Sequence, residues 1–126
     1  MADYDPFYTG GVKPFTATTS AAVTGGRVLA VSGNGTVAHA GAASTVAVGV
    51  AAHDAASGAQ VSVWPIDRVV HELSAPGAIT AAAGVVTAAA GEVATAVIAT
   101  ASAAGTLIGV AATTAASNKV RVLGRH

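Results

Sequence analysis

The chain has 126 residues, 52% of them hydrophobic, but 33 are alanine and the larger apolar residues are mainly valine, which predicts one small domain with a thin core. Such a domain is expected to gain stability from sheet hydrogen bonds and from association with other subunits. Six basic and six acidic residues cancel, which excludes the basic surface of a nucleic-acid-binding protein, and the absence of cysteine excludes disulfides and thiolate metal sites.

The first sixteen residues are expected to form an extended N-terminal arm, and residues 17–126 a β-rich domain. Tyr4, Phe7, Tyr8 and Phe15 are four of the five aromatic residues, and prolines and glycines separate them. Aromatic side chains need a surface on which to bury their apolar area, so the arm either folds back on its own domain or docks on a partner. The segment lacks the basic residues and apolar run of a secretory signal, and we expect none.

Short strands are predicted along the remaining chain. The stretch RVLAVSGNGTVAH at 27–39 predicts a hairpin whose Asn34-Gly35 pair takes the positive φ angles of a tight turn. Lys119–Val122 alternates charged residues with valine, as a half-buried strand does. Valine alternation or enrichment predicts further strands at 46–50, 61–63 and 68–73.

The alanine-rich section 81–106 is harder to assign. Alanine favours helix, but Gly84, Gly91 and Gly105 interrupt it, so short strands with at most one short helix are predicted. Residues 93–112 carry no charge and have the length of a membrane span, yet most are small and no basic or aromatic residues bracket them. We therefore expect buried strands and turns without a membrane partner, and an all-β sandwich-like or barrel-like fold overall.

The chain contains an internal repeat. VGVAAHDAASGAQVSV at 48–63 aligns with IGVAATTAASNKVRV at 108–122, with nine of fifteen positions identical and one residue deleted. AAVTGG at 21–26 is likewise similar to GAITAA at 77–82. Two related halves, at about 20–64 and 76–123, are predicted.

Two patterns suggest chemistry but favour simpler structural readings. Gly33–Ala38 fits the glycine pattern of a dinucleotide-binding turn, but that mechanism needs a helix directly after the glycines, and a hairpin is predicted there. His53-Asp54 is the one adjacent His-Asp pair, and the second half has Thr113-Thr114 in its place. The pair is interpreted as part of a surface turn in which Asp54 hydrogen-bonds to nearby backbone.

No catalytic, cofactor or metal site is predicted. His39, His53 and His71 have separations that match no compact zinc-ligand pattern. Asp67 and Glu72 differ in parity, so along an extended strand their side chains point to opposite faces and cannot work as a carboxylate pair.

Several short motifs follow one another in a specific order. An aromatic N-terminal segment leads into VTGGRVLAV and TVAHA, and VGVAAHDAASGAQVSV, VHELSAPGAIT and a second IGVAA follow. In this order the chain resembles the head decoration, or capsid cement, proteins of tailed bacteriophages, over about residues 7–123. Family members often have Gly-Asp after the Ile-Thr of the second half, whereas this chain has Ala81–Gly84, which leaves that turn open.

The resemblance implies a β-rich, β-tulip-like domain that forms a homo-trimer on the outer surface of the virion capsid. There it would clamp neighbouring subunits of the major capsid protein. The predicted capsid contact is made by the aromatic arm through Tyr4, Pro6, Phe7, Tyr8 and Phe15.

A different class of function stays open at this point. The chain is alternatively a non-catalytic β-domain that binds carbohydrate or a host surface, from a virion fibre or a cell envelope. Such sites usually present exposed aromatic side chains on rigid strands, and only Trp64 lies outside the arm.

Overall fold

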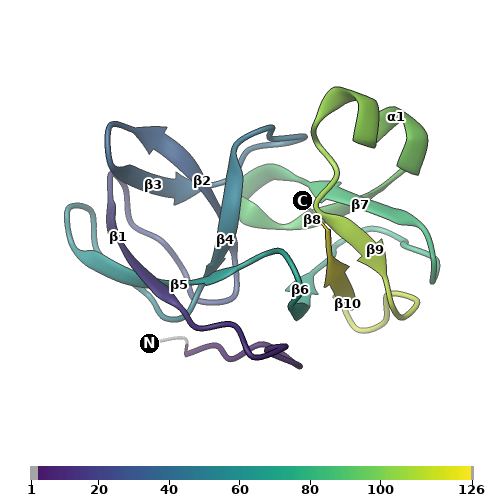
Figure 1. Ribbon diagram of the computed structural model, residues 1–126, viewed down its shortest axis with the longest axis horizontal. Coiled ribbons are helices and arrows are strands. Elements are labelled where there is room, and N and C mark those ends of the chain that lie inside the picture. The colour runs from purple at the N-terminus through teal and green to yellow at the C-terminus, as the bar shows by residue number, and fades with distance from the viewer. Residues whose placement is uncertain (1–2, 126) are drawn as a thin grey trace.

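Two five-stranded sheets make up most of the computed structural model, which describes residues 3–125 (Figure 1). The first sheet closes into a barrel in the order β1-β3-β2-β4-β5, and the second has the order β6-β10-β9-β7-β8. The strands of the barrel are β1 Phe15–Thr19, β2 Val28–Gly33, β3 Thr36–His39, β4 Ala47–Ala51 and β5 Gln60–Pro65. Those of the second sheet are β6 Val70–Ser74, β7 Gly84–Thr87, β8 Val93–Ala96, β9 Gly109–Ala111 and β10 Lys119–Gly124.

The helical part of the chain is small. A 3-10 turn, η1 Ala89–Gly91, connects β7 to β8, and one α-helix, α1 Ile98–Ala104, follows β8. The prediction of an all-β domain with at most one short helix is confirmed. Residues 93–112 form β8, α1 and β9, and no helix within residues 3–125 is long and apolar enough to cross a membrane.

The predicted strands form where valine alternates with smaller or polar residues. In β10, Val120 and Val122 are buried while Lys119 is exposed, so the predicted half-buried strand is confirmed. The hairpin of β2 and β3 is present, but the turn differs from the prediction. Gly35 has a φ of 75°, whereas Asn34 keeps a negative φ, and a register shift between Val31 and Gly33 absorbs the difference.

The two halves have the same strand arrangement. Around the barrel the strands follow the order β1-β5-β4-β2-β3, and the second sheet repeats it as β6-β10-β9-β7-β8. The pairing register also repeats, since Val50 lies opposite Trp64 and Val110 lies opposite Leu123. Even the closest backbone approach recurs, because a Cβ added to Gly49 or Gly109 would lie 2.4 or 2.3 Å from the carbonyl oxygen of the residue after the facing valine.

Hydrogen bonds outside the ladders repeat in the same way. The Gly26 N–H donates to the Ala51 carbonyl at 2.8 Å, and the Ala82 N–H donates to the Ala111 carbonyl at 2.8 Å. The internal repeat in the sequence therefore corresponds to a repeat of main-chain geometry, and residues 20–26 match 76–82 position by position.

The second sheet differs from the first because it stays open. In the barrel, β1 pairs in parallel with β3, and the Ser20 N–H donates to the Val37 carbonyl at 3.0 Å. The residue that corresponds to Ser20 is Pro76, which has no N–H to donate. Among the described residues, β6 and β8 accordingly remain opposite edges of the second sheet.

One hydrophobic core is shared by the two sheets, which lie side by side in Figure 1. Its largest side chains come from both halves: Val28, Val50, Ile66, Leu73, Ile79, Val85, Val93, Ile108, Val120 and Val122. A smaller cluster fills the barrel: Val23, Leu29, Val37, Ala51, Val61 and Val63. The η1 turn also joins the halves, since the Gly91 N–H donates to the Ala40 carbonyl at 2.9 Å.

The repeat predicts a stabilising substitution. Gly26 and Ala82 occupy matching positions with φ of 83° and 75°, a conformation that is strained for alanine and not for glycine. We expect Ala82→Gly to raise the free energy of unfolding by about 0.5–1 kcal/mol and Gly26→Ala to lower it, both measured by urea denaturation. A destabilised Ala82→Gly variant would contradict this assignment.

Candidate functional site

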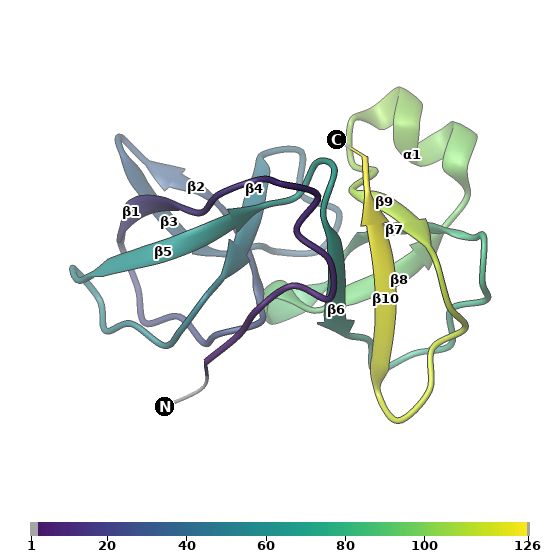
Figure 2. The same ribbon diagram turned by 60° about the horizontal axis from the view of Figure 1, so that its bottom comes forward.

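The N-terminal segment lies against the edge of β6. Tyr8 and Val70 exchange two backbone hydrogen bonds, from the Tyr8 N–H at 3.1 Å and from the Val70 N–H at 2.9 Å. Figure 2 shows the segment passing beside β6 before it continues into β1. The predicted arm is thus extended, but the structure places it along its own domain.

Tyr4 is held by a buried histidine. Its hydroxyl lies 2.6 Å from Nδ1 of His71, whose Nε2 lies 2.8 Å from the Pro65 carbonyl, and the two rings stack with centroids 5.8 Å apart. A carbonyl oxygen only accepts, so Nε2 carries the proton and Nδ1 accepts from the Tyr4 hydroxyl. This chain of hydrogen bonds requires His71 to be neutral.

Burial sets the ionisation of both groups. It lowers the pKa of His71 to about 4, although the hydrogen bond to Pro65 acts in the opposite direction. Burial likewise raises the pKa of Tyr4, and the nearby carboxylates of Glu72 and Asp5 add to the rise. Tyr4 and His71 therefore both stay uncharged at neutral pH.

Three of the five predicted contact residues expose their side chains. The exposed fractions are 58% for Phe7, 65% for Tyr8 and 43% for Phe15. Pro6 is buried and Tyr4 is mostly covered, so these two pack within the chain. The aromatic segment thus has an inner side that attaches it to the domain and an outer side that is free within this chain.

Phe7 is positioned by a charged pair on the second sheet. The Arg121 guanidinium lies 3.8 Å from the centroid of the Phe7 ring, and Nε of Arg121 lies 3.3 Å from a carboxylate oxygen of Glu72. A cation over an aromatic face stabilises the ring by about 0.5–1 kcal/mol at an exposed site. Phe7 is therefore held in place although more than half of it is exposed.

The His53-Asp54 pair binds backbone groups at a turn. Oδ1 of Asp54 accepts from the Gly25 N–H at 2.9 Å, and Nε2 of His53 accepts from the Ser62 N–H at 3.3 Å. The interpretation of the pair as part of a surface turn is confirmed.

Threonines do the same work in the second half. Oγ1 of Thr114 accepts from the Ala81 N–H at 3.1 Å, and Oγ1 of Thr113 accepts from the Arg121 N–H at 3.2 Å. Both acceptor pairs meet matching backbone positions, which the sequence alignment alone did not show. What the two turns share is a pair of side-chain acceptors, whatever their residue type.

The histidines do not come together. Nε2 of His39 accepts from the Thr24 N–H at 2.9 Å, while His53 and His71 have the separate partners given above. Within residues 3–125, no group of three His, Asp or Glu side chains is arranged to hold a metal ion.

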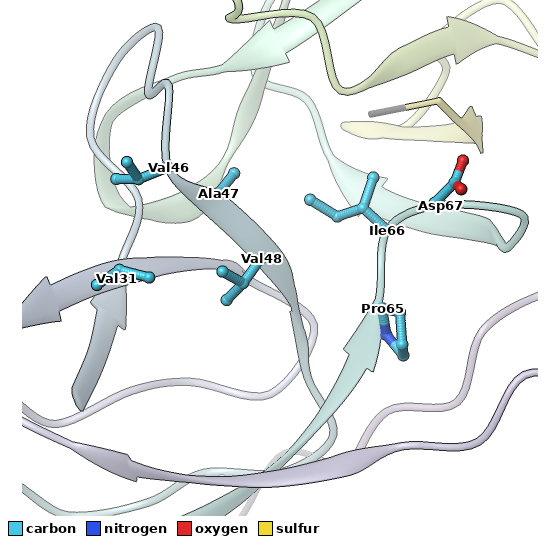
Figure 3. A pocket seen from close by; sticks show the side chains of 7 residues that line it. All are labelled: Val31, Val46, Ala47, Val48, Pro65, Ile66 and Asp67. Carbon is cyan, nitrogen blue, oxygen red and sulfur yellow. The ribbon is translucent and has the colours of Figure 1, made fainter. Parts of the chain in front are cut away.

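An apolar groove of about 440 Å³ lies beside β4 (Figure 3). Val31 and Val46 line one part of it and are about half exposed, and Pro65 and Ile66 line another. Asp67 at its rim is the one charged side chain that lines it, and Figure 3 shows the carboxylate next to Ile66. No acid–base pair faces this groove.

Comparison with solved structures establishes how widely this fold occurs. The structure titled head fiber gp8.5 N base in bacteriophage phi29 superposes with a TM-score of 0.68 over 89% of this chain and 92% of that chain, at 22% sequence identity. No curated protein matches the sequence. The chain thus has a known all-β fold that two related five-stranded units build.

The sequence match is more specific. The family model of the phage cement proteins matches residues 8–126, and the chain belongs to this family. It is accordingly a structural protein of a phage virion. The resemblance deduced from the order of short motifs is confirmed.

The two turns predict an exchange that the fold tolerates. We expect the double substitution His53→Thr and Asp54→Thr to change the free energy of unfolding by no more than about 0.5 kcal/mol, because threonine oxygens fill both acceptor roles in the second half. The double alanine variant should lose about 1–2 kcal/mol, since two backbone N–H groups lose their partners. Equal losses in both variants, measured by urea denaturation, would refute the shared role.

The buried histidine predicts a dependence of stability on pH. The pKa of His71 is about 4 in the folded chain and near 6.5 in the unfolded chain, so the unfolded state binds more protons between these values. The free energy of unfolding should therefore fall as the pH is lowered from 6.5 towards 4, by about 3 kcal/mol in total. It should be fully retained above pH 6.5.

Substitution separates this effect from that of other groups. His71→Gln keeps a donor and an acceptor but does not titrate, so most of the slope between pH 6.5 and 4 should disappear. His39→Gln is the matched control, because burial and Arg27 also lower the pKa of His39 but it is the more exposed ring. An unchanged slope in His71→Gln would show that other groups cause the acid sensitivity.

Proposed function

We propose that this protein binds the outer surface of the assembled phage capsid and cements neighbouring subunits of the major capsid protein. Its membership of the phage cement family supports a role on the head. The observation that carries the proposal is the row of exposed aromatic side chains, Phe7, Tyr8 and Phe15, on a segment that the domain holds in place. Exposed aromatic residues on a fixed backbone are typical centres of protein interfaces.

The fixed backbone matters for affinity. A disordered arm would lose conformational entropy on binding, whereas Tyr8 is already paired with Val70 and Phe7 already lies under Arg121. More of the contact energy therefore remains for binding the shell. Tyr4 and Pro6, which the sequence placed in the same contact set, contribute to this proposal by attaching the segment to the domain.

The mechanism we propose is mass action without chemistry. A protein that binds the assembled shell and not its separated subunits stabilises the shell in proportion to the binding free energy. We propose a homo-trimer as the binding unit, since three copies related by symmetry present three aromatic segments to neighbouring capsid subunits at once.

The carbohydrate-binding alternative has less support. Trp64, the one aromatic residue outside the N-terminal segment, is partly buried in β5 and faces Val50 of β4 in the sheet register. It does not offer the open aromatic platform that a sugar ring would need.

A binding assay on expanded, undecorated capsids of the phage that encodes the protein tests the proposal. We expect the double substitution Phe7→Ser and Tyr8→Ser to weaken binding by about 100-fold or more, because interface aromatic residues contribute about 2 kcal/mol or more each when truncated. Binding is measured by co-sedimentation with capsids at several protein concentrations.

Two controls give the assay its meaning. Val46→Ser removes an apolar side chain that is 49% exposed outside the segment, and it should bind as the natural chain does. Circular dichroism and urea denaturation should show both variants folded. Undiminished binding by the Phe7/Tyr8 variant would overturn the assignment of this surface.

A further inference from the structure

The outer edge of β8 carries unused main-chain hydrogen-bonding groups. The Ala88 N–H donates to the Glu92 carbonyl at 2.7 Å, and Val86 pairs with Ala94 two positions further along the β7–β8 ladder. In an antiparallel ladder such bonded positions alternate, so the main-chain groups of Ala94 point towards β7. Those of Val93 and Thr95 point away from the sheet, and no strand of the described chain pairs with them.

The first half shows what such an edge binds. Val37 of β3 corresponds to Val93, and the Val37 carbonyl accepts from the Ser20 N–H at the end of the parallel strand β1. The second half has Pro76 in place of Ser20 and cannot supply that donor itself. By the internal repeat, the ligand that fits β8 is an extended chain running parallel to it.

The opposite edge of the second sheet is already covered. The N-terminal segment pairs with β6 through Tyr8 and Val70, and the Tyr4 hydroxyl contacts the backbone of Glu72. The barrel has no free edge because β1 joins β3 to β5. A second copy of this chain therefore has no parallel strand to offer among residues 3–125, which favours a different protein as the occupant.

An apolar groove adjoins the β8 edge. It has a volume of about 320 Å³ and lies between the second sheet and α1, lined by side chains that include Val86, Ala96, Val97 and Ala101. Val97 directly follows β8 and is 70% exposed, and no charged side chain lines the groove. β8 itself, Val-Ala-Thr-Ala, has none of the charges, prolines or bulges that usually protect an edge.

We propose that β8 is a docking edge for an extended, uncharged segment of another protein, which adds as a parallel strand. A backbone N–H of the segment donates to the Val93 carbonyl, the Thr95 N–H donates to a carbonyl of the segment, and an apolar side chain of the segment enters the groove beside Val97. Backbone pairing supplies the affinity in this mode of recognition and the side-chain pocket the selectivity. The site is separate from the aromatic surface and goes beyond the function proposed above.

The chain itself provides the probe for a test. A synthetic peptide of residues 14–22, PFTATTSAA, copies β1 and the Ser20 donor and is titrated into the ¹⁵N-labelled full chain. We expect saturable shifts of the Ala94 and Thr95 amide signals and slower hydrogen exchange at Thr95. A peptide methylated on the Ser20 nitrogen should bind about tenfold more weakly, because it lacks the donor to Val93.

Substitutions in the protein test both parts of the site. Thr95→Pro removes the outward N–H at an edge position that tolerates proline, and Val97→Lys places a charge at the lip of the groove. Each should weaken peptide binding about tenfold or more. Val46→Lys changes a valine of the other groove and should bind the peptide as the natural chain does.

Three outcomes would overturn the proposal. They are the absence of saturable shifts at β8, shifts at β3 and β5 that indicate exchange of the peptide into the barrel, and a concentration-dependent shift of Thr95 without peptide that Thr95→Pro abolishes, which would identify a second copy as the occupant. The titration contains no capsid, so its result is independent of whether the aromatic surface binds the shell.

Discussion

The fold depends on a core that neither sheet could form alone. Alanine and valine give each five-stranded unit little apolar volume, and the larger side chains, such as Leu73, Ile79 and Ile108, all lie in the cluster shared by both halves. Since hydrophobic stabilisation grows with the apolar area removed from water, separating the sheets would expose most of what each one buries. The η1 turn, which joins Gly91 to Ala40, completes this contact with a backbone hydrogen bond.

The repeat inside the chain explains how such a thin core suffices. Each half places its strands with the same register and with a glycine, Gly49 or Gly109, where the facing backbone approaches too closely for any side chain. The turns are then fixed by pairs of side-chain acceptors, His53 with Asp54 and Thr113 with Thr114. Main-chain hydrogen bonding and its side-chain caps carry much of the specificity that larger core residues supply elsewhere.

The halves diverge at their edges, and the surfaces available for partners follow from that difference. In the first half β1 closes the barrel. In the second half Pro76 prevents the equivalent bond, the N-terminal segment covers β6, and β8 is left open. The same segment that protects the β6 edge also presents Phe7 and Tyr8, so protection of an edge and display of the aromatic surface depend on one piece of chain.

The sequence by itself determined the strand content, the repeat and the family, because valine alternation and the order of motifs are properties of neighbouring residues. It placed the aromatic residues in one segment, but it could not separate Tyr4 and Pro6 from Phe7 and Tyr8. That division depends on His71, Val70 and Arg121, which lie more than 60 residues away along the chain. The open edge of β8 was decided by the tertiary structure alone, because which strands pair across a sheet depends on contacts between distant segments.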